Sequence, residues 1–275
     1  MRPAAADPQG LVCAVGVRTG SGGVILAVDI GNTHVVIGLL DGERIAGSWR
    51  IATRPEMTAD ELHVLLRGFL GDRLAEVEGV ILASVVPPLT RQVSRALRRL
   101  TGHDPIEVAP GIRTGLRIRV DNPQEVGADR IVGAVAALHR YGGPAVVVDF
   151  GTATTLDVVT ASGDYLGGVI APGPAVGGEA LSRRAARLAR VDLVVPPRVI
   201  GRNTVDSLRS GLLHGHAAMV DGLVQRIEHE LGEPVRVIAT GGWVGVLAPL
   251  LARVDAVDPD LTLSGLRLLY ERNRP

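Results

Sequence analysis

One short phrase occurs twice in the chain, as Asp29-Ile30-Gly31-Asn32-Thr33 and as Asp149-Phe150-Gly151-Thr152-Ala153-Thr154-Thr155. Each copy follows an apolar run, Val24–Val28 or Ala145–Val148, which is typical of a buried strand that ends on a carboxylate. The glycine allows a sharp turn and lets backbone N–H groups approach a phosphate, because it has no Cβ. The strand-end Asp can hold a hydrated cation beside that phosphate. The repeat therefore predicts two related halves that face one nucleotide.

The composition describes a globular protein with a substantial core, since 46% of its 275 residues are hydrophobic and 21% are charged. A net charge of zero gives no general affinity for nucleic acid or for an anionic membrane. The apolar runs end after roughly five to eight residues, far short of the ~20 that span a bilayer. We therefore expect no nucleic-acid partner and no membrane partner. The single cysteine, Cys13, excludes an intramolecular disulfide and suits the cytoplasm.

The basic residues carry a sharper exclusion, because all 29 of them are arginine and the chain has no lysine. A P-loop and a protein kinase both need a lysine, as does Schiff-base catalysis, so these three classes are excluded. Residues 1–23 contain Pro, Asp and Gln where a secretion signal needs an apolar stretch, and we expect a disordered extension there.

Hydrophobic spacing and turn signals predict the order of elements. In the first half we expect strands at 24–28, 35–40, 44–51 and 80–85, and helices at 58–69, 89–100 and 122–141. The pattern restarts after Gly142-Gly143-Pro144, with strands at 145–148, 156–160 and 235–239 and helices at 180–188, 204–230 and 261–271. This order is typical of α/β architecture with mostly covered sheets. We place the domains at 24–143 and 144–275, after the extension at 1–23.

Three further segments carry candidate chemistry. Gly127-Ala128-Asp129-Arg130 begins the long helix, where the helix dipole favours an ionised Asp129 that can accept a hydroxyl proton. Arg130 can hold an anion, although a helix cap with a surface ion pair explains the pair equally well. Thr240-Gly241-Gly242 follows a strand and can form a floor for adenine and ribose. The basic stretch Arg183–Arg190 can touch phosphates, but a solvated helix face is the more ordinary interpretation.

The two phosphate turns and the Thr-Gly-Gly turn resemble the superfamily of actin, sugar kinases and Hsp70. The resemblance is much closer to one family within it, type III pantothenate kinase, and it runs from about residue 24 to the C-terminus. The matching phrases are Asp29–His34, Ala83–Pro87, Asn122–Arg130, Asp149–Thr155, Gly167–Gly173, Ile200–Thr204 and Leu261–Arg267.

This resemblance implies duplicated actin-like (ribonuclease H-like) domains, with mixed sheets flanked by helices and a nucleotide cleft between them. It implies ATP-dependent phosphorylation of pantothenate to 4'-phosphopantothenate, the first step of coenzyme A biosynthesis. It also implies a homodimer whose active sites are bordered by both subunits.

The family's residue roles transfer onto matching positions of this chain. Asp129 would be the general base, and Gly127, Ala128, Asp129 and Arg130 would bind the substrate. Asp149 would coordinate a monovalent cation, K+ or NH4+, while Mg2+ would accompany ATP. The ATP phosphates would be held by Asp29, Ile30, Gly31, Asn32, Thr33, His34, Val35, Val36 and Thr152.

Three positions depart from the family pattern. Val120 stands where many members have an aromatic residue, Gly133 replaces a common Asn, and Ala185 lacks the hydroxyl of a Thr that contacts substrate. Losing one neutral hydrogen bond costs about 0.5–1.5 kcal/mol, which weakens a kinase without abolishing it. The alternatives are a catalytically weak member that acts as a nucleotide-binding regulatory protein, and a kinase for another small alcohol. Nucleic-acid binding through Arg183–Arg190 is a third, and the zero net charge argues against it.

Overall fold

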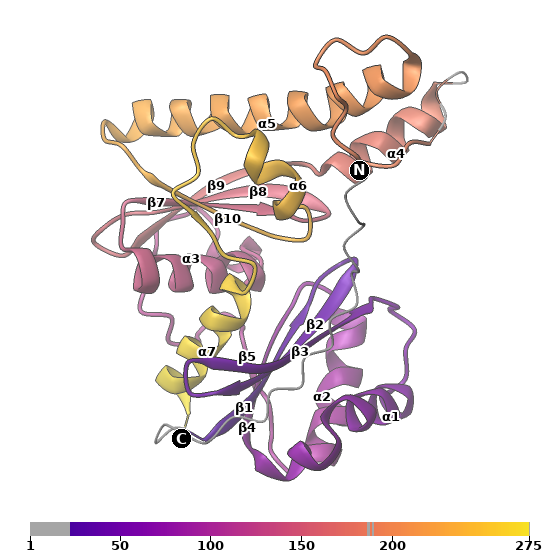
Figure 1. Cartoon of the computed structure of the whole chain (residues 1–275). Helices are drawn as coiled ribbons and strands as arrows, with labels where there is room; N and C mark the ends of the chain where they lie inside the picture. The colour runs from indigo at the N-terminus through magenta and orange to yellow at the C-terminus, as the bar shows by residue number, and fades with distance from the viewer. Residues whose placement is uncertain (1–22, 186–187, 189, 275) are drawn as a thin grey trace, which may run out of the picture.

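The computed structural model describes residues 23–185, 188 and 190–274, so most of the predicted extension and Cys13 lie outside the described residues. The chain forms two lobes, each built on one sheet (Figure 1). The first sheet has the order β3-β2-β1-β4-β5. Its strands are β1 (Val24–Ile30), β2 (His34–Asp41), β3 (Arg44–Ala52), β4 (Val77–Ser84) and β5 (Ile106–Glu107).

The second sheet has the order β11-β10-β7-β8-β9-β6. Its strands are β6 (Arg117–Ile118), β7 (Ala145–Phe150), β8 (Ala153–Val159), β9 (Asp164–Pro172), β10 (Arg236–Thr240) and β11 (Ala256–Val257). Each sheet is built on an antiparallel three-strand unit, β1-β2-β3 or β7-β8-β9, and two later strands extend it in parallel from β1 or β7. The predicted duplication and fold class are therefore confirmed.

Helices cover the sheets in an arrangement that is clear in Figure 1. Helices α1 and α2 lie on one face of the first sheet, while α5 and α3 lie on opposite faces of the second. The helices are α1 (Ala59–Leu70), α2 (Pro87–Thr101), α3 (Ala128–Tyr141), α4 (Pro174–Arg184), α5 (Thr204–Leu231), α6 (Val244–Leu247) and α7 (Leu261–Asn273). Short 3-10 helices lie at Gly71–Glu76, Pro123–Glu125 and Ala248–Leu250. In the described part of the chain, no helix combines the length and apolar character that a bilayer crossing requires.

Several predicted boundaries are wrong, and a proline explains two of them. The long helix begins at Ala128 and not at residue 122, because Pro123 starts a separate 3-10 turn. Helix α4 begins at Pro174, a residue favoured in the first turn of a helix, rather than at residue 180. Strand β8 begins at Ala153, three residues earlier than predicted. The capping box of Thr58 and Glu61 at the start of α1 is present as predicted.

Sheet membership does not follow the predicted division near residue 143. Strand β6 pairs with β9 and so belongs to the second sheet, although it precedes that position. Helix α7, at the end of the chain, packs against β1 and β4 of the first sheet. Strand β6 and helix α7 thus link the two parts of the chain, and the division near residue 143 stays a prediction.

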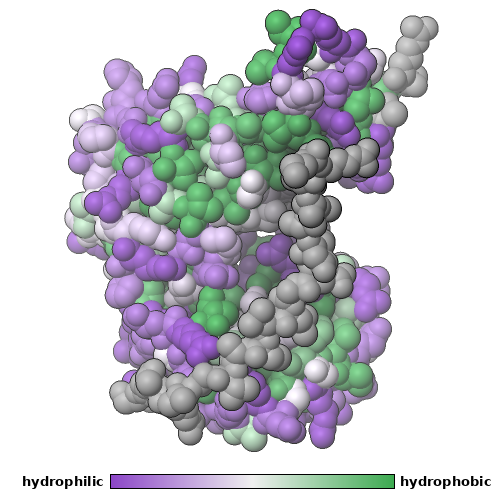
Figure 2. Space-filling model, viewed as in Figure 1, coloured by the Kyte–Doolittle hydropathy of each residue, from purple (hydrophilic) through white to green (hydrophobic). Residues whose placement is uncertain are grey.

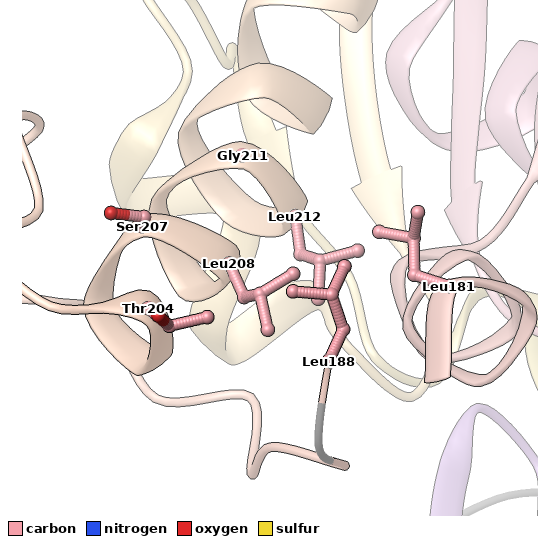
Figure 3. A pocket seen from close by; sticks show the side chains of 7 residues that line it. All are labelled: Leu181, Leu188, Thr204, Ser207, Leu208, Gly211 and Leu212. Carbon is pink, nitrogen blue, oxygen red and sulfur yellow. The ribbon is translucent and has the colours of Figure 1, made fainter. Parts of the chain in front are cut away.

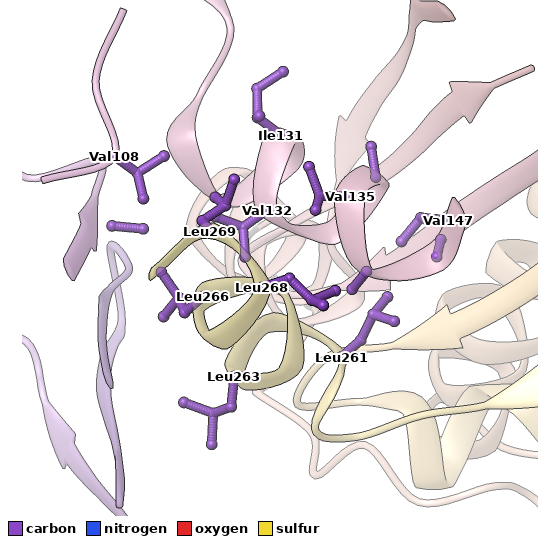
Figure 4. Close-up of a cluster of buried hydrophobic side chains, with 14 of the residues drawn as sticks. Val108, Ile131, Val132, Val135, Val147, Leu261, Leu263, Leu266, Leu268 and Leu269 are labelled. Carbon is purple, nitrogen blue, oxygen red and sulfur yellow. The ribbon is translucent and has the colours of Figure 1, made fainter. Parts of the chain in front are cut away.

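The junction between the lobes is an apolar cluster centred on α7 and α3 (Figure 4). Leucines of α7 meet Ile131, Val132 and Val135 of α3, and this contact fixes the start of α3 relative to β1. The helices approach closely at Gly265, where a Cβ would lie 2.3 Å from the carbonyl oxygen of Val132.

We expect Gly265→Ala to lower the free energy of unfolding by about 1–3 kcal/mol, because the added methyl overpacks a backbone contact. Gly215→Ala is the matched control, since Gly215 lies inside α5 and a Cβ there would meet no atom within 4 Å. That change should stabilise by about 0.5–1 kcal/mol through helix propensity. Urea unfolding of the two variants measures the predicted loss of stability in Gly265→Ala and the predicted gain in Gly215→Ala. Equal effects in the two variants would contradict the close packing of α7 on α3.

Candidate functional site

The two copies of the repeated phrase form related turns at the ends of β1 and β7, and the first turn is one residue longer than the second. The N–H of Gly31 donates to the carbonyl of His34 at 3.0 Å, and the N–H of Gly151 donates to that of Ala153 at 3.0 Å. Each turn follows a strand whose preceding residues are buried, so the carboxylates of Asp29 and Asp149 stand where their strands leave the core.

Folding brings these two turns together. The hydroxyls of Thr33 and Thr152, which are 119 positions apart in the chain, lie 2.5 Å from each other. Asn32, Thr33 and His34 are exposed, so their side chains are available to a ligand. Ile30 and Val35 are fully or almost fully buried, and only their backbone groups can face a phosphate.

The third glycine turn lies beside Asp149. Thr240 at the end of β10 pairs with Asp149 in the parallel ladder. Gly241 has a φ of +96°, and a Cβ there would lie 2.3 Å from Oδ1 of Asp149. Only glycine fits this position without moving the carboxylate, so the Thr240–Gly242 turn and the second phosphate turn form one edge of the second lobe.

Asp129 lies in the first turn of α3, as the sequence predicts, and it is partly buried. The backbone N–H of Arg130 donates to its Oδ1 at 2.8 Å. A Cβ on Gly127 would lie 2.5 Å from the same oxygen, so the small residue before the helix leaves room for this carboxyl. Ala128 separates the two.

Crowding of carboxylates sets the electrostatics of the site. Burial, followed by the charges of Asp129 and Asp149, raises the pKa of Asp29 to about 8. Burial, followed by the charges of Asp129 and Asp157, raises the pKa of Asp149 to about 7. Burial also raises the pKa of Asp129 above the ordinary range of an aspartate. The three candidate carboxylates therefore share one region of negative charge.

Arg130 makes a buried ion pair that sequence reasoning did not find. Its Nε donates to Oδ1 of Asp157 at 2.7 Å, and only 2% of Asp157 is exposed. The hydroxyls of Tyr165 and Thr155 donate to the same carboxylate at 2.7 and 2.9 Å. A charged residue among the apolar residues of β8 was the available signal. Neither simple reading of Arg130, as a surface pair or as a free anion ligand, fits this geometry.

The donor set fits a bound cation. Burial and neighbouring carboxylates raise the pKa of Asp29 and Asp149, so a cation beside them would favour their ionised forms. Carboxylate oxygens are also the ligands that hard cations prefer. The backbone N–H groups and hydroxyls of the two turns add the donors that a phosphate needs. The site can therefore hold a phosphate ester together with its cation.

Residues 25–226 match the family model of type III pantothenate kinase. The chain belongs to the type III pantothenate kinase family. A member from Moorella thermoacetica is 48% identical over 253 residues, covering 91% of this chain and all of that protein. A member from Streptomyces avermitilis is 49% identical over 261 residues, covering 91% of this chain and 98% of that protein. The family resemblance inferred from the sequence motifs is confirmed.

Solved structures of other proteins share the fold. A Campylobacter jejuni protein assigned to the Baf family of transcriptional activators has a TM-score of 0.60 at 20% identity, with 90% of this chain and 98% of that one covered. Component A of (R)-2-hydroxyglutaryl-CoA dehydratase from Acidaminococcus fermentans has a TM-score of 0.52 at 13% identity, with 89% and 95% covered. At these identities the likeness establishes the two-lobed fold alone.

We expect Asp29→Asn to stabilise the ligand-free protein, and the gain should grow as the pH rises from 5 to 8. The pKa of Asp29 rises from 3.8 to about 8 on folding, so the folded state holds the extra proton in this window and stability falls with rising pH. The amide removes that penalty. Thermal unfolding at both pH values, with a chelator and without K+ or NH4+, measures the difference; each kcal/mol corresponds to roughly 2–4 °C in a protein of this size.

Asp72→Asn, on the exposed first turn of a 3-10 helix, controls for the loss of one negative charge. A pH-independent effect of Asp29→Asn, or the same effect in both variants, would contradict the crowding of carboxylates around Asp29.

Proposed function

We propose that this protein transfers the γ-phosphoryl group of ATP to pantothenate, giving 4'-phosphopantothenate for coenzyme A biosynthesis. The observation that carries the proposal is the position of Asp129, whose charge acts on Asp29 and Asp149 at the strand ends that lead into the two phosphate turns. Family membership supplies the substrate. The geometry supports the chemistry, because phosphoryl transfer depends on positioning and charge neutralisation more than on covalent catalysis.

Asp129 is proposed to be the general base. As the pantothenate hydroxyl oxygen bonds to the γ-phosphorus, its proton passes to the Asp129 carboxylate. The bond from the γ-phosphorus to the bridging oxygen breaks, and ADP leaves with the electron pair. Gly127 and Ala128 are proposed to contact pantothenate beside the base, together with Arg130, which the Asp157 ion pair holds in one orientation.

The phosphates of ATP are proposed to lie against the two turns that Thr33 and Thr152 join. The residues proposed to hold them are Asp29, Ile30, Gly31, Asn32, Thr33, His34, Val35, Val36 and Thr152. Asp149 is proposed to bind K+ or NH4+. After burial, the charges of Asp129 and Asp157 raise its pKa, and the same negative surroundings attract a cation. Mg2+ carried with ATP would supply further neutralisation of phosphate charge.

We also propose that the protein is a cytoplasmic homodimer. Nine of the eleven large hydrophobic side chains that stay exposed in the described residues fall between Leu166 and Val205, on β9, α4, the following segment and the start of α5. Figure 2 shows hydrophobic patches on the upper lobe around these elements. Such a concentration is typical of a protein–protein interface.

A hollow in the same surface supports this assignment. It has a volume of about 420 Å³, lies between α4 and α5, and is lined mainly by Leu181, Leu188, Leu208 and Leu212 (Figure 3). Helix α4 follows directly from β9, and the last residues of β9 pair with β8, the strand that follows the second phosphate turn. A second subunit bound at this hollow would therefore lie close to the proposed substrate site.

We expect Asp129→Asn to lower kcat by about 10²- to 10⁴-fold, because the amide cannot accept the hydroxyl proton. The assay follows ADP formation with ATP and pantothenate in K+ or NH4+, with a Na+ buffer as the comparison for the proposed cation. In the wild type, kcat/KM should decrease as the pH is lowered, because the base becomes protonated. The midpoint of this decrease should lie above the ordinary pKa range of an aspartate, since burial raises the pKa of Asp129.

Equal turnover by the wild type and Asp129→Asn would refute the base assignment. Wild type that binds ATP and leaves pantothenate unchanged would favour the regulatory alternative. Turnover of a different hydroxylated metabolite would favour a kinase for another small alcohol.

We expect Ile200→Asp to convert a dimer into a monomer, because the charge would be buried in the proposed interface. Ile200 is 82% exposed in the single chain. Val64→Asp is the matched control, since Val64 is 69% exposed on α1 of the other lobe. Sedimentation velocity distinguishes the states; a monomeric wild type, or dissociation by both variants, would contradict the assignment.

A further inference from the structure

Arg50 lies in the same row of the first sheet as Asp29. In the ladder, Arg50 of β3 pairs with Val36 of β2, and Val36 pairs with Asp29 of β1. Directly paired residues point to the same face of a sheet. Val36 packs with the cluster that joins the two lobes, so this is the face that looks toward the second lobe.

The guanidinium of Arg50 reaches the second lobe. A Cβ on Gly242 would lie 3.8 Å from its Nη1, which places the arginine beside the third glycine turn. The charge of Arg50 lowers the pKa of both Asp29 and Asp149, against the larger effect of burial. It also contributes to the lowered pKa of His34, after burial. Arg50 therefore lies within electrostatic reach of both phosphate turns.

Arg50 is exposed, and among the described residues it has no carboxylate within ion-pair distance and its side chain makes no hydrogen bond. The other arginine of the site differs, because Arg130 is already paired with Asp157. A cation placed among carboxylates without a partner of its own is suited to an anionic ligand. The chain has no lysine for this role.

We propose that Arg50 is a catalytic residue that donates hydrogen bonds to the terminal phosphate oxygens of ATP. This proposal rests on the phosphoryl transfer proposed above. In the transfer, negative charge spreads over the γ-phosphoryl oxygens and onto the departing ADP, and a guanidinium fixed beside them stabilises that charge. Arg50 acts from the first lobe on a nucleotide whose base lies against the Thr240–Gly242 turn of the second.

The test compares Arg50→Gln, Arg50→Lys and Arg44→Gln in the pantothenate kinase assay. We expect Arg50→Gln to lower kcat by about 10²- to 10³-fold, the range found for one charge-stabilising donor. Arg50→Lys should recover part of the loss. Arg44 is the matched control, because it is an exposed arginine at the far end of the same strand. The exposed position of Arg50 should leave thermal unfolding close to that of the wild type.

A kcat for Arg50→Gln within threefold of the wild type would overturn the proposal, as would an equal loss in Arg44→Gln. Calorimetric titration with Mg-ATP and with AMP separates this proposal from the kinase assignment. If the wild type fails to phosphorylate pantothenate, weaker binding of ATP but unchanged binding of AMP by Arg50→Gln still supports the phosphate contact. Equal binding of ATP by both proteins, or no nucleotide binding by the wild type, overturns it.

Discussion

Crowding of like charges is the constraint on which the site depends. Asp29, Asp129 and Asp149 act on one another electrostatically in partly buried surroundings, and folding must hold them there against repulsion. The interactions among these three carboxylates are repulsive, so they cannot be what holds the carboxylates in place. Each carboxylate stands at the end of an element whose body is buried, so the apolar packing of β1, α3 and β7 supplies the stability that the repulsion opposes. The same excess of negative charge makes the region receptive to cations.

The relative placement of the three carboxylates depends on the end of the chain. Helix α7 follows the second sheet in sequence, yet it packs on β1 and β4 of the first and against α3. Gly265 and Gly38 let it approach closely, since a Cβ at either would meet Val132 or Leu263 at under 3 Å. Helix α7 therefore couples the strand that ends at Asp29 to the helix that begins near Asp129. At the exposed edge, the Thr33–Thr152 contact joins the turns with a single hydrogen bond, so the α3–α7 cluster is the stronger of the two links.

The sequence predicted what local patterns specify. The two strand-end phrases, the capping box of Thr58 and the start of α5 at Thr204 follow from residues within a few positions of one another. The pairing of Arg130 with Asp157 joins residues 27 apart, and the Arg50 row depends on ladder register across three strands. Neither leaves a local pattern. Strand β9 was not predicted, because Gly167, Gly168 and Pro172 weaken its strand signal. In the structure it nevertheless pairs with all of β8, from Ala153 to Val159.

The duplication produces equivalent positions and then makes them chemically different. Asp29 lies beside β4, which is followed by the Pro87 start of α2, whereas Asp149 lies beside β10, which is followed by Gly241 and Gly242. The turn after β10 carries no side chains at its two glycines, whereas the turn after β4 leads into a helix that begins at Pro87. A ligand can therefore approach the backbone closely at the turn after β10. The arginines of the site also differ between the two halves. Arg130 is held by Asp157 of the second lobe, whereas Arg50 extends from the first lobe with no such partner in the described residues. A pseudo-symmetric scaffold can thus bind an asymmetric substrate, because the residues after each strand differ while the strands that position them remain alike.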